Sequence, residues 1–159
     1  KEKESQLAAT GRSDVYTWRA SYLPSLNVDA QFVQDPGQDF DMLRFGLREW
    51  KKLSPYLLKD FYVLTPWHSQ DDKSGFTAYS FFDGDIGRGA ILIFRMEDCP
   101  EDKLTVMLRF TEDGGTYILT DEDSGKSFRQ SGSALKKTGC SFVLPECRTA
   151  LLVWIGMQK

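Results

Sequence analysis

The sequence predicts a mainly β protein: an antiparallel β-sandwich of about eight strands, preceded by one long amphipathic helix and a loop-rich N-terminal segment. Helical spacing of apolar residues is clear near residues 40–53, whereas short β-rich runs separated by turns fill the chain from residue 60 onward. The 159 residues are 41% hydrophobic, which is enough for one core and an added layer. We therefore divide the chain into residues 1–59 and residues 60–159.

The long helix is predicted over residues 39–53. Its apolar stripe consists of residues spaced three or four positions apart: Phe40, Leu43, Leu47, Trp50 and Leu53. Either Asp39 or Asp41 is expected to cap the first turn, where free amides and the helix dipole favour an acidic side chain. The pair Ser54-Pro55 is expected to end this helix and to begin a short second one, because proline is tolerated in a first turn.

The residues before this helix do not fit the sandwich pattern. Residues 15–18 have the composition of a strand, and residues 22–26 that of a second extended piece. Several apolar side chains in this part suggest self-association, so a homo-oligomer is among the expected partners: Leu7, Val15, Trp18 and Leu23.

Eight strands are expected after the helix, separated by turns rich in glycine, proline and aspartate. The fourth alternates apolar and polar residues, which is typical of a strand with one face in the core. The third and eighth are apolar throughout and are expected to be central or covered on both faces. The expected ranges are 61–64, 76–82, 90–96, 104–110, 116–120, 126–129, 140–144 and 149–155.

Charge and cysteine usage limit the partners. The net charge is −3 and no basic stripe is visible, which argues against nucleic acid, and no segment reaches the roughly 20 apolar residues of a membrane span. A hairpin turning at Pro145 would place Cys140 and Cys147 out of register, so free thiols are expected, and these favour a reducing, cytoplasmic location. With one histidine and no Cys-x-x-Cys pair, we expect no metal or other cofactor.

Two polar segments contain residue types found in metal-binding or catalytic sites, but neither has a complete motif. Residues 121–125 resemble part of a calcium loop but lack its downstream glutamate, so a solvated hairpin turn is the favoured interpretation. His68 has Asp71, Asp72 and Ser74 nearby, but no Gly-x-Ser-x-Gly nucleophile motif occurs. Most other carboxylates lie in expected turns, so we assign no catalytic residue.

Aromatic residues near the first two strands are candidates for carbohydrate binding, because an exposed aromatic ring stacks on the apolar face of a sugar. Core packing is the simpler interpretation for most of them. Trp67 is the exception, because it follows Pro66, where the first strand has ended. The candidate sugar platform is therefore Trp67 with Tyr62 and Tyr79.

Several stretches together resemble a known family. Residues 47–66 (LREWKKLSPYLLKDFYVLTP), 87–95 (GRGAILIFR) and 117–125 (YILTDEDSG) are similar to the C-terminal region of family 36 glycoside hydrolases, the α-galactosidase group. In that family the last helix of a catalytic (β/α)8 barrel runs into a C-terminal β-sandwich. Upstream, residues 13–20 and 23–26 resemble the final barrel strand and its approach.

The resemblance implies that residues 1–59 end a barrel and that residues 60–159 form its C-terminal sandwich. Family members hydrolyse galactosides with retention, using two aspartates on earlier barrel strands, and no segment here matches either motif. The chain alone is therefore expected to be a non-catalytic region that supports the barrel. In an intact enzyme, residues 25–29 would border the sugar pocket.

Two alternatives remain open. One is a carbohydrate-binding module that stacks a galactoside or another sugar on exposed aromatic rings. The other is a protein-interaction sandwich, which a large exposed apolar patch would indicate. A sandwich fold is compatible with all three functions.

Overall fold

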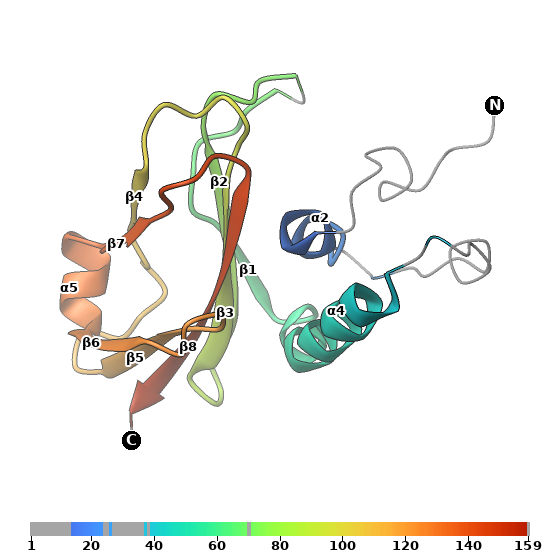
Figure 1. Cartoon of the computed structure of the whole chain (residues 1–159). Coiled ribbons are helices and arrows are strands. Elements are labelled where there is room, and N and C mark those ends of the chain that lie inside the picture. The colour runs from blue at the N-terminus through green and yellow to red at the C-terminus, as the bar shows by residue number, and fades with distance from the viewer. Residues whose placement is uncertain (1–13, 24–25, 27–36, 38, 70, 159) are drawn as a thin grey trace.

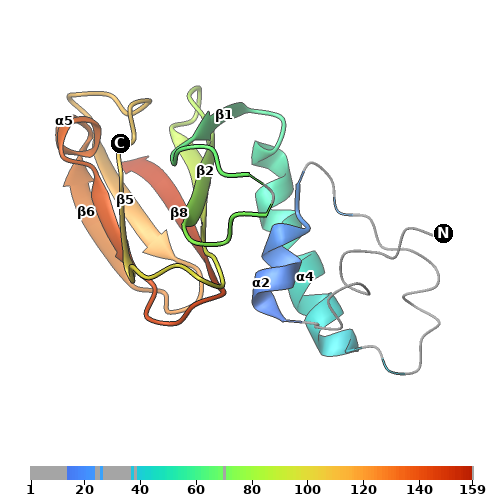
Figure 2. The ribbon, with the colours of Figure 1, turned by 90° about the horizontal axis from the view of Figure 1, so that it is seen from above.

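The computed structural model describes residues 14–23, 26, 37, 39–69 and 71–158. These residues form three layers around a central antiparallel sheet (Figure 1). A small sheet and a short helix cover one face, and two helices cover the other. Seen from above, the two helices lie side by side on their face of the sheet (Figure 2). The predicted mainly β architecture is confirmed.

The central sheet has six antiparallel strands, and the smaller sheet has two. Helix α5, Gly132–Lys137, follows the last edge strand of the central sheet. The order across the central sheet is β1 (Asp60–Val63), β2 (Phe76–Asp83), β3 (Arg88–Arg95), β8 (Thr149–Gln158), β5 (Thr116–Asp121) and β6 (Ser127–Ser131). The smaller sheet pairs β4 (Lys103–Val106) with β7 (Cys140–Val143).

The two central strands, β3 and β8, are buried on both faces, as their uninterrupted apolar sequences predicted. Successive side chains of a strand point to opposite faces. In β3, Ile91 and Ile93 enter the core shared with β4 and β7, whereas Leu92 and Phe94 enter the core beneath the helices. The sheet therefore needs a cover on each side, and the helices provide the second one.

The helical layer consists of α2 (Val15–Ala20) and α4 (Phe40–Leu53), followed by the 3₁₀ turn η1 (Ser54–Tyr56). Asp39 caps α4, since its carboxylate accepts hydrogen bonds from the amides of Asp41 and Met42. The predicted long helix, its aspartate cap and the short helical restart at Ser54 are confirmed. No helix in the described parts of the chain is both long and apolar enough to cross a membrane.

The buried side of α4 matches the predicted stripe only in part: Leu53 is fully buried, and Leu43 and Trp50 are half-buried against the same core. Phe40 and Leu47 are each 42% exposed, and the buried positions are Gly46, Glu49 and Leu53. The reason is a tertiary contact with α2. The indole of Trp18 packs on Gly46, and the guanidinium of Arg19 binds the Glu49 carboxylate, so this side of α4 is the one that is buried.

The strand expected at residues 15–18 is wrong, and so is the final barrel strand that the resemblance implied at residues 13–20. Val15–Ala20 form α2, which begins where the Asp14 carboxylate accepts a hydrogen bond from the amide of Thr17, and residue 13 lies outside the described parts. The helix turns Trp18 into the core, where it is 1% exposed. Trp18 is therefore unavailable for the self-association considered above; Leu7 and most of residues 22–29 lie outside the described parts.

Three details of the β region also differ from expectation. The fourth strand ends at Val106, after which the amide of Leu108 donates a hydrogen bond to the carbonyl of Leu135. Helix α5, which Leu135 belongs to, was not predicted; the hydroxyl of Ser131 caps it. Strand β7 pairs with β4 and not with β8, so the hairpin expected around Pro145 is absent from the described sheet. The three cysteines are free thiols, as predicted.

Candidate functional site: an aromatic cleft beside helix α2

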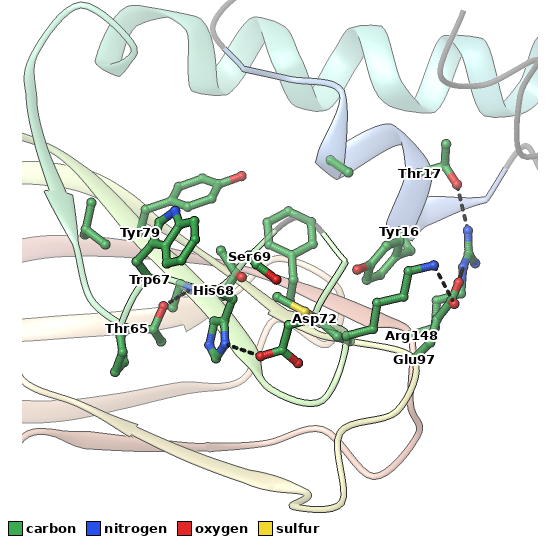
Figure 3. Close-up of a pocket in the computed structure, with 18 residues that line it drawn as sticks. Tyr16, Thr17, Thr65, Trp67, His68, Ser69, Asp72, Tyr79, Glu97 and Arg148 are labelled. Carbon is green, nitrogen blue, oxygen red and sulfur yellow. Dashed lines mark hydrogen bonds and ion pairs between the residues drawn. The ribbon is translucent and has the colours of Figure 1, made fainter.

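A cleft of about 940 Å³ lies between helix α2 and the segment that links β1 to β2. Strands β2 and β3 form its floor. Tyr16 lines it from α2, Trp67 from the linking segment, Tyr79 from the floor, and Arg148 from the turn before β8 (Figure 3). Phe94 of β3 also lines the floor. The cleft is within the size range of small-molecule sites.

The floor of the cleft is a row of aromatic rings that ends at a cation. The centroids of Tyr79 and Phe94 are 5.8 Å apart, and those of Phe94 and Tyr16 are 5.5 Å apart in an edge-to-face arrangement. The guanidinium carbon of Arg148 lies 4.8 Å from the centroid of the Tyr16 ring. Burial raises the pKa of the Tyr16 and Tyr79 phenols, so both hydroxyls stay neutral.

Arg148 fastens the first turn of α2 to the sheet. Its guanidinium donates to the Asp14 carboxylate at 2.5 Å and to the Thr17 hydroxyl at 2.9 Å. Burial alone would raise the pKa of Asp14, but the hydrogen bonds from Arg148 and Thr17 outweigh burial and lower it. The backbone of Arg148 has a positive φ of 54°, which non-glycine residues adopt rarely. We interpret this strained backbone conformation as the feature that orients the Arg148 side chain so that its guanidinium reaches α2.

The last turn of α2 is held by a buried ion cluster. Arg19 is fully buried and binds the Glu49 carboxylate of α4 and the Asp123 carboxylate of the β5–β6 turn. The hydroxyl of Tyr22 donates to Glu49 as well, at 2.9 Å. Burial would lower the pKa of Arg19, but its bonds to the two carboxylates outweigh burial and raise it. Helix α2, one wall of the cleft, is thus fixed at both ends.

Of the predicted platform residues, Trp67 and Tyr79 line the same cleft, whereas Tyr62 does not. Trp67 is 85% exposed, as its position beyond Pro66 suggested. The Tyr62 ring stacks on Phe110 with centroids 4.5 Å apart, in the core on the opposite face of the sheet. Tyr62 faces that core because neighbouring residues of a strand point to opposite sides. Sugar binding by these residues stays a prediction.

His68 is occupied by structural contacts. Its Nε2 lies 3.1 Å from the carbonyl oxygen of Phe76, and its Nδ1 lies 3.3 Å from the Asp72 carboxylate. Because a carbonyl only accepts, Nε2 carries a proton and is not a free base. Ser74 donates to Asp72 at 2.6 Å and makes no contact with the ring that an activated nucleophile would require. Hydrogen bonds from Ser74 and His68 lower the pKa of Asp72 to about 2.

The turn at residues 121–125 is a hairpin turn between β5 and β6, as predicted, but it also holds the helices. Asp123 accepts from Arg19, and Glu122 accepts from Lys52 of α4 and from the indole of Trp154. Within the described residues, no three or more His, Cys, Asp or Glu side chains lie together in a group that could hold a metal ion.

The residues that build this site were mostly missed in the sequence. Arg19, Glu49 and Arg148 carry no spacing signal, since their partners lie far away along the chain. The one local indication was Glu49 itself, an acid whose neighbours one helical turn away include the apolar residues Phe45 and Leu53.

Comparison with known proteins gives a fold likeness and no family assignment. No family model matches the chain. No curated protein matches it either. Among solved structures, the described fold is similar to the galactosidase domain of an α-galactosidase–sucrose kinase, AgaSK, with a TM-score of 0.57 and 18% sequence identity. The similarity covers 76% of this chain and 16% of that protein, so this chain spans a small part of the enzyme it resembles.

Proposed function

We propose that this chain is the non-catalytic C-terminal β-sandwich region of an α-galactosidase-like retaining glycoside hydrolase. Residues 60–159 are its sandwich, and residues 1–59 belong to the end of the barrel that the sandwich supports. The fold likeness to a galactosidase domain and the resemblance noted in the sequence support this assignment. The helical layer adds a physical reason.

The observation that carries the proposal is the two-sided character of α4. One side, with Leu53 at 0% exposure, is buried in the core shared with α2 and the sheet. The other side leaves Phe40 and Leu47 each 42% exposed, and Leu58 beyond the helix is 94% exposed. Phe40 and Leu47 are seven residues apart and so share one outward face of α4, and exposed apolar side chains on a shared face are typical of a surface that packs on a further layer. The proposed further layer is the catalytic barrel.

Two measurements test this function. The chain alone is incubated with a chromogenic α-galactoside, and no turnover is expected; robust hydrolysis would contradict the non-catalytic role. The chain is then mixed with the galactosidase barrel of the structural relative, prepared without its own corresponding C-terminal region. Co-purification of the two is expected, together with an increase in the barrel's thermal midpoint.

A matched pair of variants makes the second test specific. Phe40→Ser/Leu47→Ser is expected to abolish co-purification while leaving the chain's own unfolding nearly unchanged, because both side chains are already partly exposed. Phe128→Ser, which removes an aromatic ring exposed on β6 far from α4, is the control. Failure of the unaltered chain to associate, or loss of association only in the control, would overturn the supporting role.

A further inference from the structure

We propose that the cleft beside α2 is a binding site for a short neutral saccharide, in which one sugar ring stacks on Trp67 above the aromatic floor. This inference does not depend on a barrel, because every residue of the cleft belongs to this chain. It concerns the part of the cleft built by α2, by β2 and β3, and by residues 63–69 and 71–73.

Trp67 contributes little to the core. A tryptophan that packs in a core buries up to about 250 Å² of surface, and this burial is its main contribution to the stability of a fold. Here the side chain is 85% exposed, and it lines the same cleft as Tyr79 (Figure 3). An exposed indole beside an aromatic floor offers a flat apolar surface to a ligand.

The segment that carries Trp67 is held in place from both ends. Before it, the amide of Leu64 donates to the carbonyl of Ala78, and the Thr65 hydroxyl accepts from the Ala78 amide at 3.1 Å. After it, His68 packs so closely on Gly75 that a Cβ at that position would lie 2.6 Å from the ring. The indole is therefore presented by an anchored backbone, which reduces the entropy that a ligand must overcome.

The charges around the cleft compensate each other, which favours a neutral ligand. Lys73 lies 3.3 Å from one oxygen of Glu97, and the Arg148 side chain lies 3.4 Å from the other. The Asp72 carboxylate accepts a hydrogen bond from the Ser74 hydroxyl and lies 3.3 Å from Nδ1 of His68. Among the side chains that line the cleft, the cations Lys73 and Arg148 are therefore matched by two carboxylates, and neither sign is in excess to select an anion or a cation.

Neutral hydroxyl-rich ligands match what the cleft offers. A sugar ring has an apolar face for the indole, and its hydroxyls both donate and accept. The partly exposed Asp72 accepts such donors, and the Tyr16 and Tyr79 phenols are neutral groups that donate or accept. The volume of about 940 Å³ accommodates two or three sugar units in an open cleft.

The test uses the whole chain and four defined sugars: melibiose, raffinose, maltose and cellobiose. Each is titrated to 50 mM while amide and indole NMR shifts and tryptophan fluorescence are recorded. At least one sugar is expected to shift the Trp67 indole signal, with a dissociation constant in the millimolar range. Absence of any shift from all four sugars would overturn the proposal.

Variants then locate the site. Trp67→Ala is expected to weaken binding at least tenfold, and Asp72→Asn several-fold, while urea unfolding of Trp67→Ala stays near that of the unaltered chain. Tyr62→Phe and Phe128→Ala are the controls, because both residues lie away from the cleft. Binding that survives Trp67→Ala, or preferential binding of a proline-rich peptide to the same indole, contradicts a saccharide site.

The outcomes separate this inference from the proposed function. Phe40→Ser/Leu47→Ser, which is designed to abolish association with a barrel, is expected to leave sugar binding unchanged. Loss of sugar binding in Trp67→Ala is likewise expected to leave barrel association intact.

Discussion

Arg19 and Glu49, which are 30 residues apart in the chain, form a bidentate pair between helices α2 and α4. The Nε and one terminal nitrogen of Arg19 donate to the two Glu49 oxygens at 3.0 and 2.7 Å. The remaining donors reach Asp123 at 2.8 and 2.7 Å and the carbonyl of Ala150 at 2.7 Å. All five N–H groups of the guanidinium thus have an acceptor, which is the condition under which a buried charge is tolerated.

Arg19→Met is expected to destabilise the chain by about 3–5 kcal/mol, because it leaves the Glu49 carboxylate buried without its cation. Arg19→Met/Glu49→Met is expected to recover most of that loss. Urea unfolding followed by circular dichroism measures both. The control is Arg44→Met, which breaks an exposed pair with Asp41 and is expected to cost at most about 1 kcal/mol. Equal costs for Arg19→Met and Arg44→Met would rule out the proposed role of burial.

Gly46 allows Trp18 to pack against α4. A Cβ at this position would lie 2.3 Å from Cε3 of the indole. Alanine normally stabilises a helix interior by about 0.5–1 kcal/mol relative to glycine. Gly46→Ala is nevertheless expected to destabilise the chain by about 1–3 kcal/mol, because the indole must move. Thermal unfolding measures the change, and Gly84→Ala, where no atom lies within 4 Å of the added Cβ, is the matched control. A Gly46→Ala variant as stable as the control would show that the indole adapts without cost.

The fold was largely predictable where local pattern decides it. The cap at Asp39, the end of α4 at Ser54 and the double burial of β3 and β8 each follow from neighbouring residues. Helix α2 was not predictable in this way. Residues 15–20 have an aromatic and β-branched composition, and what makes them helical includes Arg148, more than 130 residues further along the chain. Propensity was overridden by tertiary contacts.

The candidate site shows the same limit. The exposure of Trp67 could be predicted from Pro66, since proline ends the strand before it. Which of Tyr62 and Tyr79 faces the cleft could not be predicted from the sequence, because it depends on the register in which β1 pairs with β2. Tyr62 pairs with Ser80, and Val63 with Tyr79, and a shift of one residue would exchange their faces.

Asp14 makes the attachment of α2 dependent on pH. Its pKa is lowered in the folded chain, so the folded state favours the ionised carboxylate. This contribution is present above the ordinary value of 3.8 and is lost as the pH falls through the lowered folded pKa. Asp14→Asn is expected to be less stable than the unaltered chain at pH 7, and the gap is expected to close toward pH 3. Urea midpoints at pH 7, 5 and 3 measure it, with exposed Asp71→Asn as the control. A gap that persists unchanged at pH 3 would contradict an ionic contribution.

The three thiols are expected to differ sharply in reactivity. Cys147 is exposed, whereas Cys99 and Cys140 are buried, and burial raises the pKa of Cys140 to about 12. The thiolate is the reactive form, and at pH 8.5 a thiol with that pKa is ionised in on the order of one molecule in three thousand. Iodoacetamide at pH 8.5 should therefore label Cys147 within minutes and the other two only as fast as the chain opens.

Peptide mass spectrometry over time separates the three sites, and 6 M urea, on the order needed to unfold a small domain, supplies the fully reactive reference. In Cys147→Ser, labelling of the folded chain should fall nearly to zero while labelling in urea drops by one site. Because β7 and β8 are not joined as a hairpin, oxidation should not link Cys140 to Cys147 in the folded chain. Rapid labelling of Cys140 without urea, or a Cys140–Cys147 disulfide under mild oxidation, would show that the core around β7 opens far more readily than its packing indicates.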